Sequence, residues 1–492
     1  MQALARQGRG VSVLARGLAT TATNTTRQGP TSSPVLITAR HSFNCNTHRA
    51  VLASTLVQLR RRAFSVQSQQ YDKLEKPDRI RGGGASGMDP YTEPKSKQEP
   101  GPLDGFRVLD LTRVLEKVAE VIKIENPKGG DDTRAWGPPF AKNLDPSDPA
   151  QESAYFLGVN RNKKSITVNL RSEEGKQLIH DLVKKVDVLV ENYVPGKLDE
   201  MGLGYKELSA LNPRLVYTSI TGYGQTGPYR TRPGYDVMVE AEGGLMYITG
   251  EQGGTPVKVG VAVTDLTTGL YAYGAIMAAI IARGRTGRGQ HIDCSLLDSQ
   301  VVTLANIASS YLIAGQEASR WGTSHPSIVP YQVLPSKDSH IMIGAGNDGQ
   351  FKILCNVLGL DSLCENPSYK TNKDRVHNRK ALIAILTERL QTKNNEEWLK
   401  ALEGRGIPFA PINNIAQTFE HPQVVARDMI QEIDHPKAGK IKLTGPAVKY
   451  SETKPSIRIP PPLLGQHTDE ILKDILGYDE ERIQLLREKK AV

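Results

Sequence analysis

The sequence predicts an α/β fold, with a large domain built on a doubly wound parallel (Rossmann-like) sheet and a smaller α+β domain after it. From residue 101 onward, apolar runs typical of buried strands alternate with segments typical of helices, which is the order of a parallel sheet with crossover helices. A second set of strands and helices begins near residue 325. The chain has 492 residues, of which 38% are hydrophobic, enough for roughly two or three cored domains.

The first two strands are expected at residues 108–111 ("VLDL") and 121–125 ("VIKIE"). Neighbouring parallel strands need a crossover of about a dozen residues or more, usually a helix. Only residues 112–120 lie between these two runs. The segment is therefore a short crossover, a hairpin, or a place from which residues are missing.

The next elements alternate as a doubly wound sheet requires. Ser172 is expected to cap a helix with two glutamates in its first turn, where acidic groups are favoured by the helix dipole. A short helix should end at Leu211. Strands are expected at residues 165–170, 187–192 and 214–224.

The middle of the chain predicts a strand at residues 257–263 and a buried helix at 270–282. This helix is the longest apolar run, and it is too short to span a bilayer, so no membrane partner is expected. Further on, residues 340–359 indicate a strand, a glycine turn and a helix. Residues 377–404 indicate one long polar helix, and the final stretch indicates capped helices.

Composition divides the chain into five parts. Residues 1–70 hold nine Arg and no Lys, Asp or Glu, and they are rich in Ser and Thr, which is typical of a mitochondrial transit peptide. The protein is therefore expected in the mitochondrial matrix. The remaining parts are a linker at 71–100, the large domain at 101–320, a small domain at 325–425 and a return to the large domain at 430–492.

Charge and cysteine content argue against several classes of function. The formal net charge is +9, and the nine Arg residues of the first 70 positions account for all of it, so no nucleic-acid partner is expected. The four cysteines show no C-x-x-C spacing, which supports neither a disulfide framework nor a zinc site. No metal is expected.

Asp265, in "VAVTDL", is the first candidate for chemistry. It stands between the expected strand at 257–263 and the apolar helix. The residues alone favour a structural interpretation, because Asp is a preferred helix N-cap. The same place is the carboxyl end of a strand, where open α/β sheets bind ligands, and a fixed carboxylate there could attack an activated acyl group.

Other polar residues lack a distinctive spacing, and a structural interpretation is favoured for each. Asp236 and Glu242 could support acid/base chemistry near such a nucleophile. Lys163 and Lys164 precede a strand and could meet a phosphate, although a solvated pair is favoured.

Ten short stretches, taken together, resemble the family III CoA-transferases over roughly residues 101–485. No one stretch is decisive, but ten of them in family order within one chain are specific. They are "PLDGFRVLDLTRV", "EVIKIENPKGGDDTR", "NRNKKSITVNL", "DVLVENYVPGKLDEMGLGY", "GYGQTGP", "GYDVMVEAEGG", "RTGRGQHIDCSLLDS", "HPSIVPYQV", "GIPFAPIN" and "LLGQHTDEIL".

The resemblance implies roles for particular positions. It matches Asp265 to the family's nucleophile, Asp236 to an acidic site residue and Tyr155 to an aromatic residue near the ligand. It also implies that two chains interlock as a homodimer. The implied CoA-contact positions are Val114, Asn126, Val168 and Arg171.

The activity that the resemblance implies is transfer of CoA from succinyl-CoA to a dicarboxylic acid such as glutarate or 3-hydroxy-3-methylglutarate. Asp265 would carry the covalent intermediate, CoA thioesters would be substrates, and no cofactor would be bound permanently. The family also has a racemase branch acting on 2-methylacyl-CoA, which needs a base such as His just before the acid at 236. This chain has Tyr235 there, so a transferase is favoured.

The chain departs from the family between its first two strands. Relatives follow "VLDLTRV" with a Gly-Pro loop and a helix that line the pocket, whereas this chain continues through residues 115–118 directly into "AEVIKIE". Roughly ten residues are absent, which is most of one helix. A skipped exon, a faulty gene model or a splice form would explain the difference, and the chain could then be an inactive scaffold.

Overall fold

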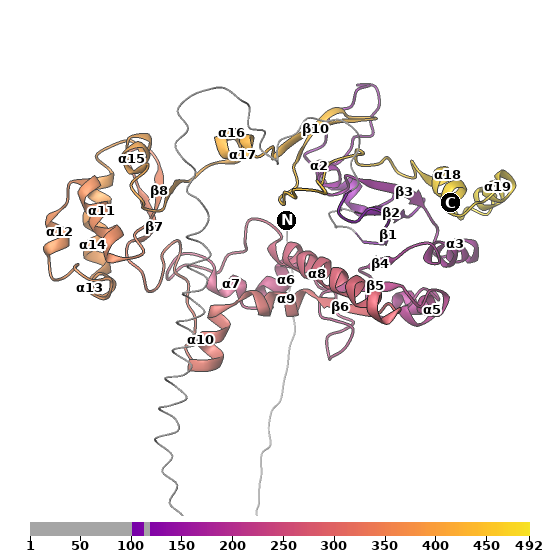
Figure 1. Ribbon diagram of the computed structural model, residues 1–492, viewed down its shortest axis with the longest axis horizontal. Coiled ribbons are helices and arrows are strands. Elements are labelled where there is room, and N and C mark those ends of the chain that lie inside the picture. Colours follow the sequence, from indigo (N-terminus) through magenta and orange to yellow (C-terminus); the bar gives the residue numbers. More distant parts are fainter. Residues whose placement is uncertain (1–100, 113–118) are drawn as a thin grey trace, which may run out of the picture. The chain divides into compact units, whose positions relative to one another are not determined.

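Six parallel strands form the central sheet of the protein (Figure 1). The computed structural model describes residues 101–112 and 119–492. The strand order is β3-β2-β1-β4-β5-β6, and it reverses direction between β1 and β4, so the sheet is doubly wound as predicted. The strands are β1 (Arg107–Asp110), β2 (Glu120–Glu125), β3 (Lys163–Thr167), β4 (Val188–Glu191), β5 (Val216–Thr221) and β6 (His291–Ser295).

Strands β1 and β2 are parallel neighbours, with Arg107 opposite Glu120 and Asp110 opposite Lys123. A hairpin is therefore excluded, because it would make the pair antiparallel. Only the nine positions 111–119 connect the two strands. Val114 and the expected deletion point at 115–118 lie outside the described residues, so the missing segment stays a prediction.

Successive residues of a strand face opposite sides of the sheet, and β4 shows this clearly. Leu189 belongs to a core shared with α3, α5 and α19, whereas Val188 and Val190 belong to a second core shared with α8. Burial on both faces explains why the first three residues of this strand are all apolar. The four helices are α3 (Glu173–Val183), α5 (Tyr205–Leu211), α8 (Val263–Thr286) and α19 (Glu480–Glu488).

Two local predictions on this part of the chain are confirmed. Ser172 is the N-cap of α3, where its hydroxyl accepts a hydrogen bond from the backbone N–H of Gly175. Helix α5 ends at Leu211, as expected. Both outcomes follow from short-range chemistry that the sequence carries directly.

Helix α8 is longer than predicted, since it starts at Val263 rather than at residue 270. Among the described residues it is the one helix that is long and apolar enough, by length and composition, to cross a membrane, so the expectation that no segment reaches that length is wrong. One face of α8 packs on the sheet through Ile276 and Ala279, which lie with Val216 of β5 in one core. That packing is the arrangement of a core helix.

The predicted strand at residues 257–263 does not form. Val257 and Val261 are 44% and 60% exposed, and no strand pairs with this segment. Alternating valines match the period of a strand, but a strand also needs a neighbour, and here the N–H of Val257 donates to the carbonyl of Thr249 instead. The strand at this edge of the sheet is β6. The sequence did not predict β6, because Asp293 interrupts its apolar pattern.

The single polar helix predicted at residues 377–404 is also wrong. The structure has three helices there, α13 (Asn372–His377), α14 (Arg379–Leu390) and α15 (Asn395–Leu402). The side chain of Asn394 and the carboxylate of Glu397 form a capping box that starts α15. Such a box satisfies backbone N–H groups at a new helix start, so it separates helices that composition alone would join.

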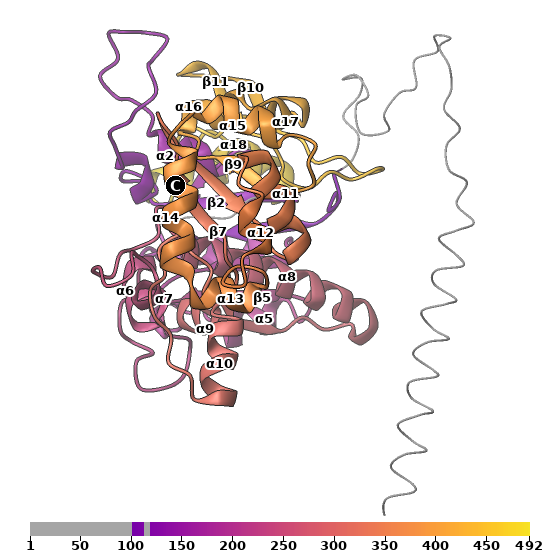
Figure 2. The same ribbon diagram turned by 90° about the vertical axis from the view of Figure 1, so that its left-hand side faces the viewer.

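A three-stranded antiparallel sheet, β7-β8-β9, forms a third core with α11, α12, α14 and α15 (Figure 2). The strand, turn and helix expected at residues 340–359 are confirmed as β8 and α11, with Asn347 as the helix N-cap. The bounds are β7 (Tyr331–Pro335), β8 (His340–Gly344), β9 (Phe409–Pro411), α11 (Asp348–Leu358) and α12 (Ser362–Glu365).

The last segment of the chain packs against β3. The N–H of His467 donates to the carbonyl of Ser165, and the side-chain oxygen of Asn162 accepts from the N–H groups of Arg458 and Ile459. The remaining elements are η1 (Asp132–Ala135), α2 (Ala154–Val159), α4 (Lys197–Glu200), α6 (Asp236–Glu242), α7 (Leu245–Ile248), α9 (Leu296–Thr303), α10 (Asn306–Ala314), α16 (Ile415–Glu420), α17 (Pro422–Ala426), β10 (Ile430–His435), β11 (Gly439–Thr444), α18 (Thr468–Glu470) and η2 (Ile471–Ile475).

Candidate active site

A cavity of about 310 Å³ lies at the carboxyl ends of the parallel strands. Thr112 after β1, Asn192 after β4, Thr221 at the end of β5 and Leu296 after β6 all line it. These strands include the pair at which the strand order reverses, which is where open α/β sheets bind ligands. The charged residues that line this cavity are Arg230, Arg232 and Asp265.

Asp265 lies in the first turn of α8 and lines the cavity. The N-cap of α8 is Ala262, so the interpretation of Asp265 as a cap is wrong. The carboxyl group is accessible from the cavity but crowded by protein on its other sides. This loss of solvation, together with the charge of Asp236, raises the pKa of Asp265 to about 6. Above that pH the group is an ionised carboxylate facing the cavity.

Asp236 supports Asp265 through the backbone. It is the first residue of α6 and is buried, and its Oδ1 accepts hydrogen bonds from the N–H groups of Thr264 (2.8 Å) and Asp265 (3.1 Å). Backbone N–H groups at a helix start have no partner within the helix. The carboxylate of Asp236 therefore fixes the turn that carries Asp265, which is a positioning role.

Tyr155, near the start of α2, lines the same cavity and lies edge-on to Trp136, with ring centroids 5.1 Å apart. Burial raises the pKa of its phenol, and the negative charge of Asp265 raises it further. The phenol therefore stays protonated and is a hydrogen-bond donor at the cavity wall. The structure thus brings Tyr155, Asp236 and Asp265 together at one site.

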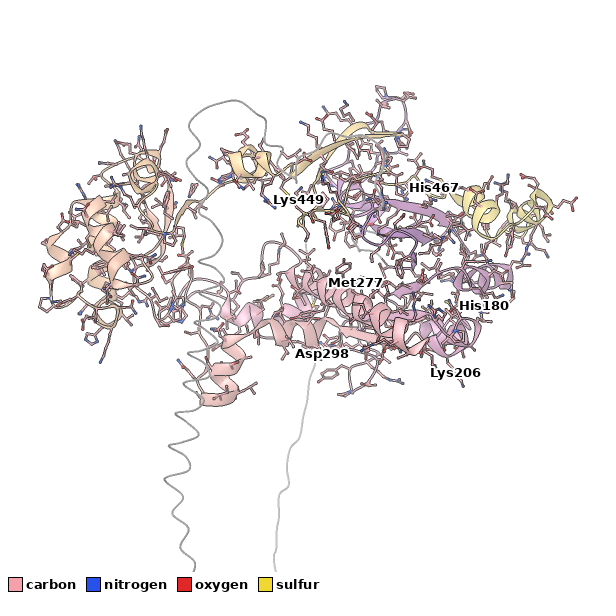
Figure 3. All side chains as sticks on the ribbon, viewed as in Figure 1. His180, Lys206, Met277, Asp298, Lys449 and His467 are labelled. Carbon is pink, nitrogen blue, oxygen red and sulfur yellow. The ribbon has the colours of Figure 1, made fainter. Side chains whose placement is uncertain are left out.

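Tyr235 lines the cavity at the position where a racemase would need its base, and its side chain is 60% exposed. No histidine is found among the described residues that line the cavity. His180 and His467, both labelled in Figure 3, make backbone contacts elsewhere. Nε2 of His180 is 2.9 Å from the carbonyl oxygen of Gly202, and Nδ1 of His467 accepts from the N–H of Ser165.

The three described CoA-contact positions, Asn126, Val168 and Arg171, do not line the cavity. Asn126 follows β2, and its side-chain oxygen accepts from the N–H of Lys128. Val168 follows β3 and is 1% exposed, so its side chain belongs to the core. Arg171 is exposed. Val114 lies outside the described residues, so contact of these four positions with CoA stays a prediction.

Lys163 and Lys164 are not the solvated pair that the sequence favoured. Lys163 is fully buried, with its Nζ 3.0 Å from Oδ2 of Asp110. Lys164 binds the carboxylates of Glu120 (2.8 Å) and Glu470 (2.9 Å). The two lysines are the first residues of β3, and both are engaged by carboxylates.

Two arginines of the cavity wall were not singled out from the sequence. Arg232 is engaged, because Glu242 binds it at 2.7 Å and the rings of Tyr223 and Tyr229 lie 5.4 and 5.5 Å from its guanidinium. No ion pair of the Arg230 side chain is found among the described residues, although it lines the cavity. The available signal was "YRTRPGYD", a pair of cations in the glycine-rich loop after a strand end.

The model of CoA-transferase family III matches residues 103–468 of this chain. The chain belongs to CoA-transferase family III. It is 53% identical over 392 residues to the human succinyl-CoA:glutarate CoA-transferase, which covers 78% of this chain and 88% of that protein. It is 42% identical over 384 residues to the succinate–glutarate CoA-transferase of Agrobacterium fabrum, covering 76% and 96% of the two chains.

The crystal structure of a CaiB/BaiF family protein from Brucella suis has the same fold. Its TM-score is 0.70 at 42% sequence identity, and the match covers 77% of this chain and all of that one. The resemblance drawn from ten sequence stretches is therefore confirmed, and the protein is a CoA-transferase. Its substrates are CoA thioesters.

Proposed function

We propose that this CoA-transferase moves CoA from succinyl-CoA to glutarate or a similar dicarboxylate, such as 3-hydroxy-3-methylglutarate, through a covalent intermediate on Asp265. The observation that carries the proposal is the position of Asp265, which faces the cavity at the strand ends from a helix start anchored by Asp236. The relatives named above are transferases between succinyl-CoA or succinate and glutarate, which supports these acids as substrates.

The covalent route consists of four exchanges. The Asp265 carboxylate attacks the succinyl carbonyl, and CoA thiolate leaves to give a mixed anhydride. The thiolate attacks the aspartyl carbonyl, succinate leaves, and an aspartyl-CoA thioester remains. A glutarate carboxylate then displaces CoA from Asp265, and the thiolate attacks the glutaryl carbonyl, which yields glutaryl-CoA and free Asp265. Carboxylate and thiolate exchange at every step, so no proton is consumed.

Arg230 explains why the acceptor acid would carry two carboxylates. One carboxylate of the acid reacts at Asp265, and the other needs a cation within the same cavity, since a desolvated carboxylate is costly without a partner. Arg232 is already bound by Glu242, whereas the Arg230 guanidinium has no ion pair among the described residues and lines the cavity. The phenol of Tyr155 is a hydrogen-bond donor in the same cavity. The proposed CoA contacts are Asn126, Val168, Arg171 and Val114.

A homodimer is part of the proposal. The outward face of α8 leaves Leu266 and Leu270 exposed, and α10 exposes Leu312 and Ile313 at 80% and 85%. Exposed apolar residues of this size and number favour a protein partner. A second copy of the chain would cover them, as the family resemblance implies. The Arg-rich first 70 residues support delivery to the mitochondrial matrix.

The test is a CoA-transfer assay with succinyl-CoA and glutarate. The account expects glutaryl-CoA from the full chain and none from Asp265→Ala. Incorporation of deuterium next to the thioester carbonyl of a 2-methylacyl-CoA, without transfer, would instead indicate a racemase.

A second candidate function is suggested by the link between β1 and β2. Its nine positions are fewer than a parallel crossover normally needs. In this reading the chain is an inactive scaffold that lacks part of the pocket wall. It would form dimers without binding CoA, and transcripts of the same gene would carry extra codons between Thr112 and Val121.

A further inference from the structure

Glu240 is a buried acid next to the candidate nucleophile's anchor that the mechanism above does not use. It lies one helical turn after Asp236 in α6, and none of its surface is exposed. Its Oε2 accepts a hydrogen bond from the N–H of Val259 at 3.0 Å. Its Oε1 is buried and receives no hydrogen bond from the described residues.

Asp236 precedes Glu240 by four positions in α6, so the two buried side chains lie next to each other on one face of the helix. Two ionised carboxylates in contact repel each other strongly when they are buried, and such pairs resolve the conflict by holding one proton between them. Burial raises the pKa of Glu240, and Asp236 raises it as well. The N–H of Val259 and the charge of Lys258 act in the opposite direction.

The charges around this acid come from three segments. Asp236 faces it from the same helix, Lys258 from the segment before α8, and Asp265 stands beyond Asp236 at the start of α8. From α9, the neutral Gln300 contacts the start of α8, where its Oε1 accepts a hydrogen bond from the hydroxyl of Thr264. With Asp236 and Glu240 both ionised, these two and Asp265 would place three negative charges near the first turn of α8.

We propose that Glu240 is held as a neutral carboxylic acid whose O–H donates to Asp236, and that it is a positioning residue for Asp265. The proton leaves Asp236 free to accept the N–H groups of Thr264 and Asp265 through Oδ1, and it keeps the Asp236–Glu240 pair at one negative charge. The catalytic consequence rests on the proposed function of Asp265. Loss of this proton at high pH repels the pair, disturbs the anchor of Asp265 and lowers kcat.

The proposal is tested by the pH profile of kcat for four proteins. The wild type should show a decline on the alkaline side. Glu240→Ala, which has no donor, should lower kcat about tenfold across the profile. Glu240→Gln should restore most of that loss and remove the alkaline decline, because an amide N–H donates at every pH. Glu207→Gln, an exposed acid on α5 that does not line the cavity, is the control and should keep the wild-type decline.

Infrared spectroscopy gives a measurement that does not depend on turnover. At neutral pH the wild type should show the C=O stretch of a protonated carboxylic acid, absent from Glu240→Gln and present in Asp265→Asn. An unchanged band in Glu240→Gln, or an alkaline decline that survives in that variant, overturns the proposal. Failure of CoA transfer in the wild type would count against the proposed function alone, since the band is read without substrate.

Discussion

At the scale of single residues, the site depends on the charge state of a few carboxyl groups. Asp265 must be ionised to attack a thioester, yet its surroundings favour the neutral form. The same surroundings destabilise the folded protein whenever Asp265 is charged. A nucleophile of this kind is therefore expected to trade stability for reactivity.

The pH dependence of Asp265 follows from its pKa, which is raised from 3.8 to about 6. The group's favourable contribution to folding is complete below its unfolded pKa and is lost as the pH rises through about 6, where kcat should rise. Asp265→Asn should therefore be inactive, and above pH 6 its Tm should exceed that of the wild type. Thermal unfolding across the pH range checks this, and a difference that does not shrink toward pH 4 contradicts it.

Arg230 is expected to select the acceptor. Replacing it by Met removes a charge-assisted contact with the distal carboxylate and should lower kcat/KM for glutarate roughly tenfold to a hundredfold. In a ping-pong reaction, kcat/KM for the acceptor reports the second half-reaction alone. Monomethyl glutarate, which lacks the second charge, is the matched acceptor. An equal loss for both acceptors would contradict the assignment.

At the scale of elements, the site is a junction between α6 and α8. The backbone of the first turn of α8 is hydrogen-bonded to the side chain of Asp236 from α6. The position of Asp265 therefore depends on how the two helices meet. The residues that flank Asp265 in the sequence do not predict how α6 and α8 meet. The junction therefore explains why two acids so far apart in the sequence act on one turn.

Asp236→Asn should keep the junction and change its charge. The amide oxygen still accepts the two N–H groups, while the negative charge that raises the pKa of Asp265 is removed. The acid limb of kcat should then move to lower pH. Asp236→Ala leaves buried N–H groups without a partner and should destabilise the protein by about 1–3 kcal/mol. A denaturant titration and the pH profile distinguish the variants, and an unmoved acid limb in Asp236→Asn would count against the electrostatic coupling.

Sequence reasoning succeeded where local chemistry decides the outcome. The apolar strands of the sheet and the cap at Ser172 follow from burial on both faces and from short-range hydrogen bonds. It failed at residues 257–263 and at β6, where strand pairing depends on a neighbour far along the chain. The residues alone made Asp265 a candidate but favoured a helix cap, and only the family resemblance favoured a nucleophile. Arg230 and Glu240 were missed because their roles depend on which other charges lie nearby.

At the scale of the whole molecule, two features bear on assembly and activity. The apolar residues of α8 and α10 lie uncovered, and the nine-position link between β1 and β2 limits what the pocket wall can contain. The first supports a second copy of the chain. The second decides whether this form of the protein is a competent enzyme.

Replacing Leu312 by Arg should break the proposed dimer, because the side chain is 80% exposed and would place a charge in an apolar contact. The matched control is Leu485→Arg on α19, which is 50% exposed and lies on a different helix. Sedimentation velocity should give a dimer for the wild type and the control, and a monomer for Leu312→Arg. A wild-type monomer would rule out the proposed assembly.

The central claim is that CoA becomes covalently attached to Asp265 during transfer, and the mass of this intermediate can be measured directly. The protein is incubated with succinyl-CoA, quenched, digested, and the peptide containing Asp265 is measured by mass spectrometry. The account predicts CoA attached to Asp265 as a thioester, lost on addition of glutarate with release of glutaryl-CoA. Full transfer activity with no adduct on that peptide, or with an adduct on another residue, would contradict it.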